Sequence, residues 1–319
     1  MKKNHRSTIV MLTGGLGNQL FQLTAGIYTS NGSKLFLDCS LGNPRSITTG
    51  SPILNTLTLP QDVQILPIQK RKMLASKTAG FMLRQGVSQR IFEKVPGAKY
   101  LFRILATIIL STYFKQLVNI IQNKGIGYCN IKIRRRNNLL IGYFQSSNWA
   151  EIVRIKNQLM SLTVKEKNRE IIRYKLLADK ELPLVVHIRL GDYKNESDFG
   201  IPSEKYYEKA IKMMWSTKRY KSVWIFSDEP ILAKKMIGKF LPDQVRWIGR
   251  IGSNSAIVWE VMRFGRGFVI ANSTFSWWAA HLAYYQKASV IAPLPWFKEI
   301  PEPVGLVPAN WKRLHAWGE

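Results

Sequence analysis

Three apolar runs in the second half of the chain each end in polar residues that could bind a charged ligand. His187 and Arg189 close the first run, Asp228 follows the second, and Asn272 begins the polar stretch after the third. Runs of this length and composition predict buried strands. Because open α/β sheets bind ligands at the carboxyl ends of their parallel strands, we expect these groups to meet at one edge of a sheet.

The first group carries the sharpest chemistry. Alternation along a strand sends His187 and Arg189 to the same face. A guanidinium group in that position can hold a phosphate through two parallel hydrogen bonds. The alternative is that Arg189 forms a structural ion pair with Asp192, three residues further along the chain.

The other two groups each have a functional and a structural explanation. The Asp228 carboxylate could accept hydrogen bonds from a base or a ribose, but a helix N-terminus with Pro230 in its first turn explains it equally well. Hydroxyls and free amides at the start of the helix after the third run would form an anion site. That stretch consists of Asn272, Ser273, Thr274, Phe275 and Ser276. We expect Trp277 and Trp278, which follow, to pack the helix against the sheet.

A glycine-rich loop near the N-terminus is a weaker candidate. Gly14, Gly15, Gly17, Asn18 and Gln19 lie between a predicted strand and a predicted helix, where backbone N–H groups can approach a phosphate or a sugar. The loop lacks the third glycine of a dinucleotide fingerprint and the Gly-Lys-Ser/Thr ending of a phosphate-binding loop. A tight turn without a ligand is the alternative.

The elements that would position these residues alternate between strand and helix. Strands are predicted over 7–12, 34–38, 138–144, 184–189, 223–227, 245–247, 267–271 and 289–292. Helices are predicted over 20–30, 148–162, 168–179, 203–215, 230–240, 256–262 and 277–285, and over 70–121 with breaks at Gly80, Gly86 and Pro96-Gly97. Residues 39–70 are predicted as mostly loop. This alternation predicts an α/β fold with parallel, helix-covered sheets, and the length of 319 residues suggests two domains.

The charge of the chain is unusual for a globular composition. The formal net charge is +27, and the segment from Lys70 to Arg136 holds 15 basic residues against one acid, Glu93. A solvated basic face explains this segment, and so does an anionic partner such as a membrane surface, a nucleic acid or a phosphorylated substrate. Its apolar stretch 100–121 is too short between its charges to span a bilayer. We expect a buried core helix there, with a helix at a membrane surface as the alternative.

Several classes of protein are excluded or disfavoured. The composition excludes collagen-like and wholly disordered chains. Cys39 and Cys129 form no CxxC motif, which favours a reducing compartment. The first apolar run is too short for a signal peptide, so we expect a cytoplasmic protein. The four histidines lack ligand spacing, and neither Asp-x-Asp nor Gly-x-Ser-x-Gly occurs. Metal hydrolases and serine hydrolases are therefore disfavoured, and a nucleotide diphosphate bound without a metal is favoured.

In their order along the chain these motifs resemble those of glycosyltransferase family 11, the inverting α-1,2-fucosyltransferases. The resemblance covers residues 8 to about 297, and several motifs in a fixed order are more specific than any one of them. The matching segments are Gly14 to Gln22, Gly142 to Ser146, His187 to Tyr193, Phe226 to Asp228, Ala271 to Trp278 and Val290 to Phe297.

The resemblance implies a GT-B architecture, with two Rossmann-like domains and a cleft between them. The expected domains are an acceptor-side domain over 1–165, with the basic helical segment 70–136, and a GDP-sugar-binding domain over 166–319. By resemblance, Arg189 would hold the β-phosphate of the donor, and His187 and Asp228 would lie at the nucleotide. Asn272 and the stretch from Ser273 to Ser276 would bind the donor at its diphosphate, and the glycine loop would close the cleft.

The implied reaction is the inverting, metal-independent transfer of fucose from GDP-fucose to the 2-hydroxyl of a galactose-terminated glycan, in surface polysaccharide synthesis. No cofactor or metal is expected. Asp192 is the first candidate for a general base, although it could equally orient Arg189, and the departing phosphate could take the proton instead. Leu190 stands where related enzymes commonly carry a second arginine. Because alternation points position 190 away from the site, loss of activity need not follow.

Two alternatives to this function stay open. One is a fucosyltransferase of the same clan with another linkage, and the other is an inactive protein that binds glycans or anions. The expected partners are GDP-fucose and a galactoside acceptor, with lipid-linked glycans as candidates. Peripheral contact with an anionic membrane explains the basic segment better than nucleic acid does, because all 10 tryptophans lie at or after Trp149, outside that segment.

Overall fold

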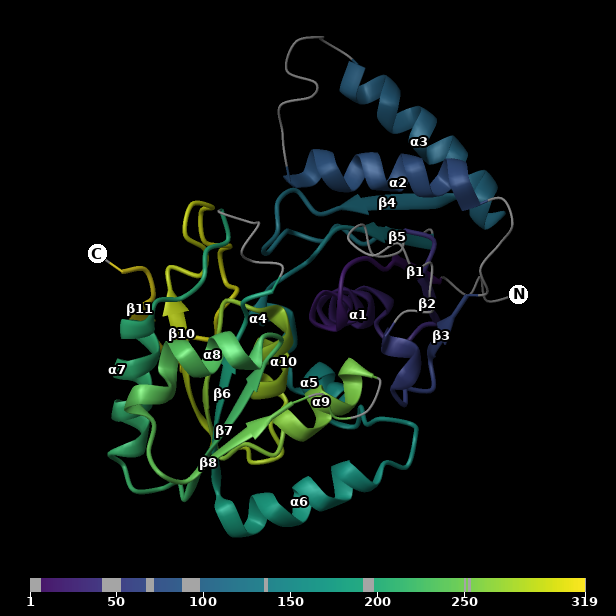
Figure 1. Ribbon diagram of the computed structural model, residues 1–319. Helices are drawn as coiled ribbons and strands as arrows, with labels where there is room; N and C mark the ends of the chain where they lie inside the picture. Colours follow the sequence, from purple (N-terminus) through teal and green to yellow (C-terminus); the bar gives the residue numbers. More distant parts are fainter. Residues whose placement is uncertain are drawn as a thin grey trace. The chain divides into compact units, whose positions relative to one another are not determined.

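The computed structural model in Figure 1 describes residues 7–41, 53–66, 72–87, 98–134, 137–191, 198–249, 251 and 254–318. The chain divides into two compact units, each built on its own sheet. Unit 1 comprises residues 1–162 with 303–306, and unit 2 comprises 163–302 with 307–319. Both sheets are parallel throughout, so the predicted α/β class is confirmed.

The return of residues 303–306 to unit 1 differs from the expected domain limits, which placed them in the second domain. The carbonyl oxygen of Gly305 accepts hydrogen bonds from the backbone N–H of Ser147, at 2.7 Å, and from the hydroxyls of Ser146 and Ser147, at 3.1 and 3.0 Å. These contacts are distant in sequence, so no local pattern indicates them.

Unit 1 contains a five-stranded sheet in the order β3-β2-β1-β5-β4. Its strands are β1 (Thr8–Met11), β2 (Leu35–Asp38), β3 (Val63–Ile65), β4 (Val118–Gln122) and β5 (Asn137–Ile141). Its helices are α1 (Leu16–Ser30), α2 (Lys72–Val87), α3 (Ala98–Phe114), α4 (Ser147–Ala150) and α5 (Val153–Met160), with a short 3₁₀ turn η1 (Ile53–Thr56). Figure 1 shows α2 and α3 over one face of the sheet and α1 over the other.

The prediction of a helical segment over 70–121 was wrong at its end and at two of its expected breaks. Its last residues form strand β4, because Val118, Ile120 and Ile121 are buried against β5. Neither Gly80 nor Gly86 breaks α2, which runs on to Val87 and contributes Ala79 to the core of unit 1. The predicted break at Pro96-Gly97 lies outside the described residues. The stretch 39–70 is less irregular than predicted, since it contains η1 and β3.

Unit 2 contains a six-stranded sheet in the order β11-β10-β9-β6-β7-β8. Its strands are β6 (Pro183–Ile188), β7 (Ser222–Ser227), β8 (Val245–Ile248), β9 (Gly267–Val269), β10 (Ser289–Leu294) and β11 (Lys312–His315). Its helices are α6 (Arg169–Glu181), α7 (Glu204–Trp215), α8 (Pro230–Ile237), α9 (Ser255–Met262) and α10 (Thr274–His281), with a 3₁₀ turn η4 (Gly238–Phe240). Apart from β11, each of these strands and α-helices was predicted, with ends shifted by a few residues.

Local sequence signals explain several element boundaries in unit 2. The Ser203 hydroxyl accepts a hydrogen bond from the backbone N–H of Tyr206 at 3.3 Å, so α7 is a capped helix as predicted. Trp277 and Trp278 are fully buried, which confirms that they pack α10 into the core. None of the described helices combines the length and the apolar character needed to span a bilayer.

Candidate functional site

The sheet of unit 2 reverses its strand order between β6 and β9. From β6 the chain proceeds to β7 and β8 on one side, whereas β9, β10 and β11 lie on the other side. Such a switch point is where open α/β sheets bind ligands. His187 and Arg189 lie at the end of β6, the segment Asn272 to Ser276 follows β9, and Asp228 follows β7. The structure therefore brings the described members of all three predicted groups to one edge.

Asp228 organises the turn after β6. Its Oδ2 atom lies 3.2 Å from Nη1 of Arg189. Its two oxygens also accept hydrogen bonds from the backbone N–H groups of Leu190, at 2.9 Å, and Gly191, at 3.0 Å. The pair is partly exposed, with 35% of the Arg189 side chain and 23% of the Asp228 side chain accessible. The carboxylate thus fixes both the turn and the guanidinium group.

These contacts exclude one of the two explanations given for Asp228, the helix cap. The side chain does not cap α8, because the N-cap residue is Glu229 and makes no side-chain capping hydrogen bond. The Glu229 backbone N–H donates to the Ser227 hydroxyl at 3.1 Å. Asp192, the candidate general base, lies outside the described residues, and so does its proposed ion pair with Arg189.

His187 is a buried, neutral group at this edge. Burial, together with the adjacent Arg189 charge, lowers the pKa of its imidazole to about 3, against an opposing effect of Asp228. The ring lies 6.0 Å from that of Phe275, between centroids. Its Nδ1 atom has no hydrogen-bond partner among the described residues. The imidazole can therefore exchange a hydrogen bond with a ligand, but it supplies no charge.

Two residues of the segment after β9 form hydrogen bonds within the fold. Asn272 donates from Nδ2 to the carbonyl oxygens of Phe199 and Gly200, at 2.8 and 3.1 Å. The buried Ser276 hydroxyl donates to the carbonyl oxygen of Ser273 at 3.2 Å. Both predicted binding residues thus have structural contacts within the fold.

The remaining residues of that segment form the start of α10. Ser273 is the N-cap residue, and its side chain makes no capping hydrogen bond. Thr274 and Phe275 in the first turn are half-buried. The first backbone N–H groups of a helix carry partial positive charge, so this turn can stabilise an anion beside Arg189.

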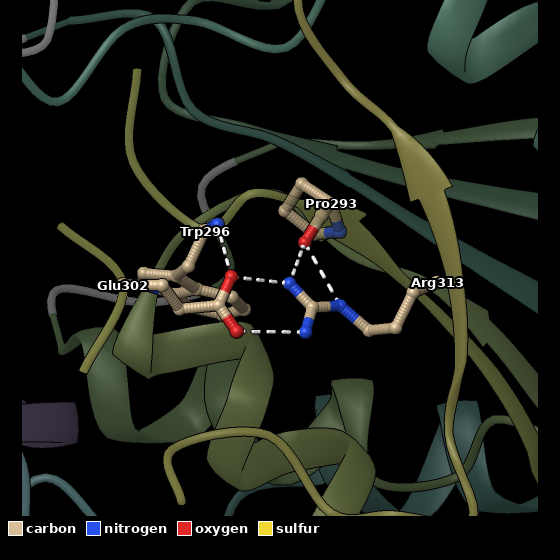
Figure 2. A network of polar contacts seen from close by, with 4 residues as sticks. All are labelled: Pro293, Trp296, Glu302 and Arg313. Carbon is tan, nitrogen blue, oxygen red and sulfur yellow. Dashed lines mark hydrogen bonds and ion pairs between the residues drawn. The ribbon is translucent and has the colours of Figure 1, made fainter. Parts of the chain in front are cut away.

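A polar network fixes the segment that follows β10 (Figure 2). Arg313 donates to both carboxylate oxygens of Glu302, at 2.8 and 2.7 Å, and from Nε to the Pro293 carbonyl oxygen at 3.0 Å. The backbone N–H of Trp296 donates to the same carboxylate at 2.7 Å. Although burial raises the pKa of Glu302, the Arg313 guanidinium group outweighs this and holds the pKa below its usual value.

This network supports the loop that Asn272 holds. The Phe297 ring packs on that of Phe199, with centroids 5.2 Å apart. The backbone N–H of Lys298 donates to the carbonyl oxygen of Phe199 at 3.2 Å. The chain that returns after β6 is therefore fixed from two sides, beside the start of α10.

Two tyrosines that the sequence analysis did not single out support the same edge. The Tyr206 hydroxyl donates to the carbonyl oxygens of Ile270 and Ile291, at 2.7 and 3.3 Å, and the Tyr207 hydroxyl donates to that of His187 at 3.2 Å. Burial raises the pKa of both phenols, so both remain protonated donors. Their position in a capped helix was predictable, but their partners were not.

Leu190 belongs to the core of unit 2. It is 5% exposed and packs in a cluster that includes Tyr207 and Met214. Its side chain is thus part of the core, whereas Arg189 is partly exposed, as the alternation predicts. Among the described residues, no group of three or more His, Cys, Asp or Glu side chains could hold a metal ion.

The glycine loop of unit 1 is shorter than predicted, because α1 begins at Leu16 and includes Gly17. Gly14 has φ +76°, and Gly15 is the N-cap residue. Gln19 holds the turn, since its Nε2 donates to the Gly14 carbonyl oxygen at 2.9 Å and its Oε1 accepts from the Leu54 N–H at 3.1 Å. Its buried amide is thus engaged within the fold.

The first two motifs of the sequence form one assembly. β1 and β5 are neighbours, so the glycine loop and the segment from Gly142 meet at their carboxyl ends. Gln22 accepts from the Thr13 N–H and donates to the Gly142 carbonyl oxygen, both at 3.0 Å. Asn18 accepts from Nε2 of Gln145 at 3.0 Å. These residues all lie at the carboxyl edge of the unit 1 sheet.

The fold is that of the GT-B glycosyltransferases. The crystal structure of fucosyltransferase NodZ from Bradyrhizobium matches with a TM-score of 0.50 at 11% identity, over 87% of this chain and 93% of that chain.

The sequence model of glycosyl transferase family 11 matches residues 104–299. The chain belongs to this family. It is 26% identical to the O-antigen biosynthesis glycosyltransferase WbnK of Escherichia coli, over 90% of this chain and 93% of that protein. It is 33% identical to an alpha-1,2-colitosyltransferase of Escherichia coli, over 50% and 60% of the two chains. It is 27% identical to a galactoside 2-alpha-L-fucosyltransferase of Caenorhabditis elegans, over 54% and 51%.

Proposed function

We propose that this glycosyltransferase transfers fucose from GDP-fucose to the 2-hydroxyl of a galactose-terminated glycan, with inversion and without a metal. The observation that carries the proposal is Arg189, held by Asp228 at the switch point of unit 2 beside the start of α10. Two relatives of the chain are named for transfer in α-1,2 linkage or to the 2-position of a galactoside, and a third for O-antigen synthesis.

In the proposed reaction the acceptor hydroxyl oxygen bonds to the anomeric carbon while the bond from that carbon to the diphosphate breaks. Negative charge then grows on the departing diphosphate. Arg189 and the first N–H groups of α10 would stabilise this charge. In enzymes with an Asp-x-Asp motif, a metal ion has this role. The proton of the acceptor would pass to Asp192 or to the departing phosphate.

The neighbouring groups would serve this arrangement in different ways. Asp228 would orient the guanidinium group, because it also fixes the backbone on either side of Leu190. The neutral imidazole of His187 would offer a hydrogen bond to the nucleotide without competing with Arg189 for the phosphate charge. In unit 1, the glycine loop and the Gln145 segment would form the acceptor side, and lipid-linked galactosides are the acceptors that O-antigen synthesis suggests.

The test is GDP release by the Arg189→Ala variant with GDP-fucose and lactose. We expect a loss of about 2–4 kcal/mol of transition-state stabilisation, or about 30- to 900-fold in rate. Arg173→Ala is the control, because Arg173 is an exposed arginine of unit 2 paired only locally, with Glu170 at 3.2 Å. Near wild-type turnover in a folded Arg189→Ala enzyme would sink the proposal. Turnover that stops on adding a chelator would contradict the absence of a metal.

A colitose donor should be tested in the same assay, because the relative at 33% identity is a colitosyltransferase. Competition between GDP-fucose and a nucleotide-activated colitose identifies the preferred donor through the ratio of their kcat/KM values. Linkage analysis of the product then separates α-1,2 transfer from transfer to another hydroxyl. Binding of GDP without any transfer would favour the inactive glycan- or anion-binding alternative.

A further inference from the structure

Helix α3 of unit 1 exposes a continuous apolar face. Leu101, Ile104, Leu105 and Ile108 are 63%, 42%, 52% and 58% exposed. Their spacing of three and four residues places them on one side of the helix. Tyr100 is 72% exposed and lies four residues before Ile104, so it extends the same side. We call these five residues the α3 face.

The opposite side of α3 already forms the core of unit 1. Ala106, Leu110 and Tyr113 are buried in the cluster that also contains Ile9 and Ile120 of the sheet. A helix on the surface of a globular protein usually presents polar residues to solvent. The α3 face therefore is not needed for the fold, and a contiguous exposed apolar surface of this kind marks an interaction site.

The charge of the segment that contains the α3 face indicates the kind of partner. The sequence from 98 to 136 contains no acidic residue, and its basic residues are Lys99, Arg103, Lys115, Lys124, Lys132, Arg134, Arg135 and Arg136. The exposed ones among the described side chains are Arg103, Lys115, Lys124, Lys132 and Arg134. A second copy of the chain would bring the same charge against itself. A partner that is both apolar in its interior and anionic at its surface satisfies both features.

We propose that the α3 face docks the protein on an anionic lipid bilayer, with the helix lying in the interface between headgroups and acyl chains. The proposal goes beyond the transfer reaction and does not depend on it. With 17 residues and an opposite side buried in the core, α3 would insert only its exposed side. The exposed basic side chains of the same segment would contact the lipid headgroups, so attachment would weaken as salt is added.

The first experiment compares vesicles of phosphatidylglycerol with vesicles of phosphatidylcholine in a flotation assay with the full chain. We expect binding to phosphatidylglycerol at low salt, loss of most of that binding at high salt, and little binding to phosphatidylcholine. Absence of binding to phosphatidylglycerol at low salt overturns the proposal. Equal binding to both lipids would show that the basic side chains do not select an anionic surface, and would overturn that part of the proposal.

The second experiment tests the face itself with a matched pair of variants. Leu101→Ser/Leu105→Ser removes two apolar side chains four residues apart that are 63% and 52% exposed. The control Ile172→Ser/Leu176→Ser removes an equally spaced pair in α6 of unit 2, at 59% and 61% exposure. We expect the first variant to bind phosphatidylglycerol about ten-fold or more weakly, since it loses apolar area that would leave water, and the control to bind as wild type.

Three further measurements separate a loss of membrane binding from misfolding and from self-association. Both variants should keep the wild-type circular dichroism spectrum, and both should keep transfer to a soluble acceptor. Equal vesicle binding by the two variants overturns the proposal. A concentration-dependent dimer in sedimentation that the α3 variant alone abolishes would show that a second copy covers the face, and would also overturn it. Because flotation requires no sugar transfer, failure of the proposed reaction leaves this test unaffected.

Discussion

At the scale of single residues, one carboxylate determines the geometry of the candidate site. Asp228 binds the guanidinium group of Arg189 and two backbone N–H groups of the turn after β6. Hydrogen bonds to a charged group are stronger than those between neutral groups. Asp228 is therefore a positioning residue for Arg189.

This predicts a kinetic effect for Asp228→Asn. The amide keeps only one of the two acceptors of the turn and loses the charge that holds Arg189. We therefore expect kcat/KM for GDP-fucose to fall by about 10- to 100-fold, which is about 1.4–2.7 kcal/mol. The loss should lie mostly in kcat, because the guanidinium group acts on the charge of the departing diphosphate. Steady-state kinetics with varied GDP-fucose measures the split.

The chain offers a matched control for this prediction. Glu181 pairs with Arg246 in the same unit, at side-chain exposures of 21% and 34% that resemble those of the Asp228 pair. It precedes β6 and lies at the opposite edge of the sheet. Glu181→Gln should therefore lower stability without changing kcat. Equal kinetic losses in both variants would mean that Asp228 acts only through stability.

The sequence indicated where the residues of the site lie, but not all of their contacts. Strand ends and alternation were sufficient to place His187, Arg189 and Asp228 at one edge. The hydrogen bonds from Asn272 to Phe199 and Gly200 join positions 72 or more residues apart. Such partners depend on tertiary packing, and no local pattern encodes them.

At the scale of elements, the connection after β5 depends on a close backbone approach. Gly142 has φ +153°, and a Cβ atom there would lie 2.2 Å from that of Asn123. Asn123 in turn accepts the Phe144 N–H at 2.9 Å, and Phe144 is buried with φ +53°. The segment that carries Gln145 is therefore shaped by one glycine and one asparagine.

We expect Gly142→Ala to destabilise the protein by roughly 2–4 kcal/mol, because the methyl group must displace Asn123 and the backbone conformation is unfavourable for alanine. Urea denaturation of the full chain measures the free energy of unfolding. Gly249→Ala is the control, since a Cβ atom there would meet nothing within 4 Å. A Gly142→Ala protein as stable as the control would show that the segment can relax around the methyl group.

Element boundaries were predicted less well where two patterns share the same residues. The apolar stretch 100–121 contains the end of α3 and the start of β4. Periodicity alone does not separate a short buried strand from the end of a buried helix. Strand β11 has the sequence KRLH, with a single apolar residue, so nothing local indicates it. Its place is set by pairing with β10 and by the contacts of Arg313 with Glu302 and Pro293.

At the scale of the whole molecule, the same arrangement occurs twice. Each unit has a parallel sheet, and in both units the motifs of the sequence lie at the carboxyl ends of the strands. In unit 2 this edge also holds the reversal of strand order between β6 and β9. The α/β class and the two sheets followed from the alternation of elements, because that alternation recurs over the whole chain. The formal net charge of +27 also affects the whole molecule, because protonation in acid can only increase this charge and the repulsion that it causes.

Acid should therefore destabilise the protein, and His187 should contribute across a defined range of pH. Its pKa is about 3 in the folded protein against an ordinary value of 6.5. Between these values the unfolded chain binds a proton that the folded protein does not, so the free energy of unfolding falls as the pH is lowered. One such proton gives a slope of up to about 1.4 kcal/mol per pH unit.

Urea denaturation from about pH 7 to about pH 4 tests this prediction. We expect the free energy of unfolding to fall less steeply for His187→Gln, which lacks the titrating group. All other groups are common to the two proteins, so their difference isolates His187. Parallel curves would mean that the imidazole takes up its proton equally well in the folded protein, contrary to its burial beside Arg189.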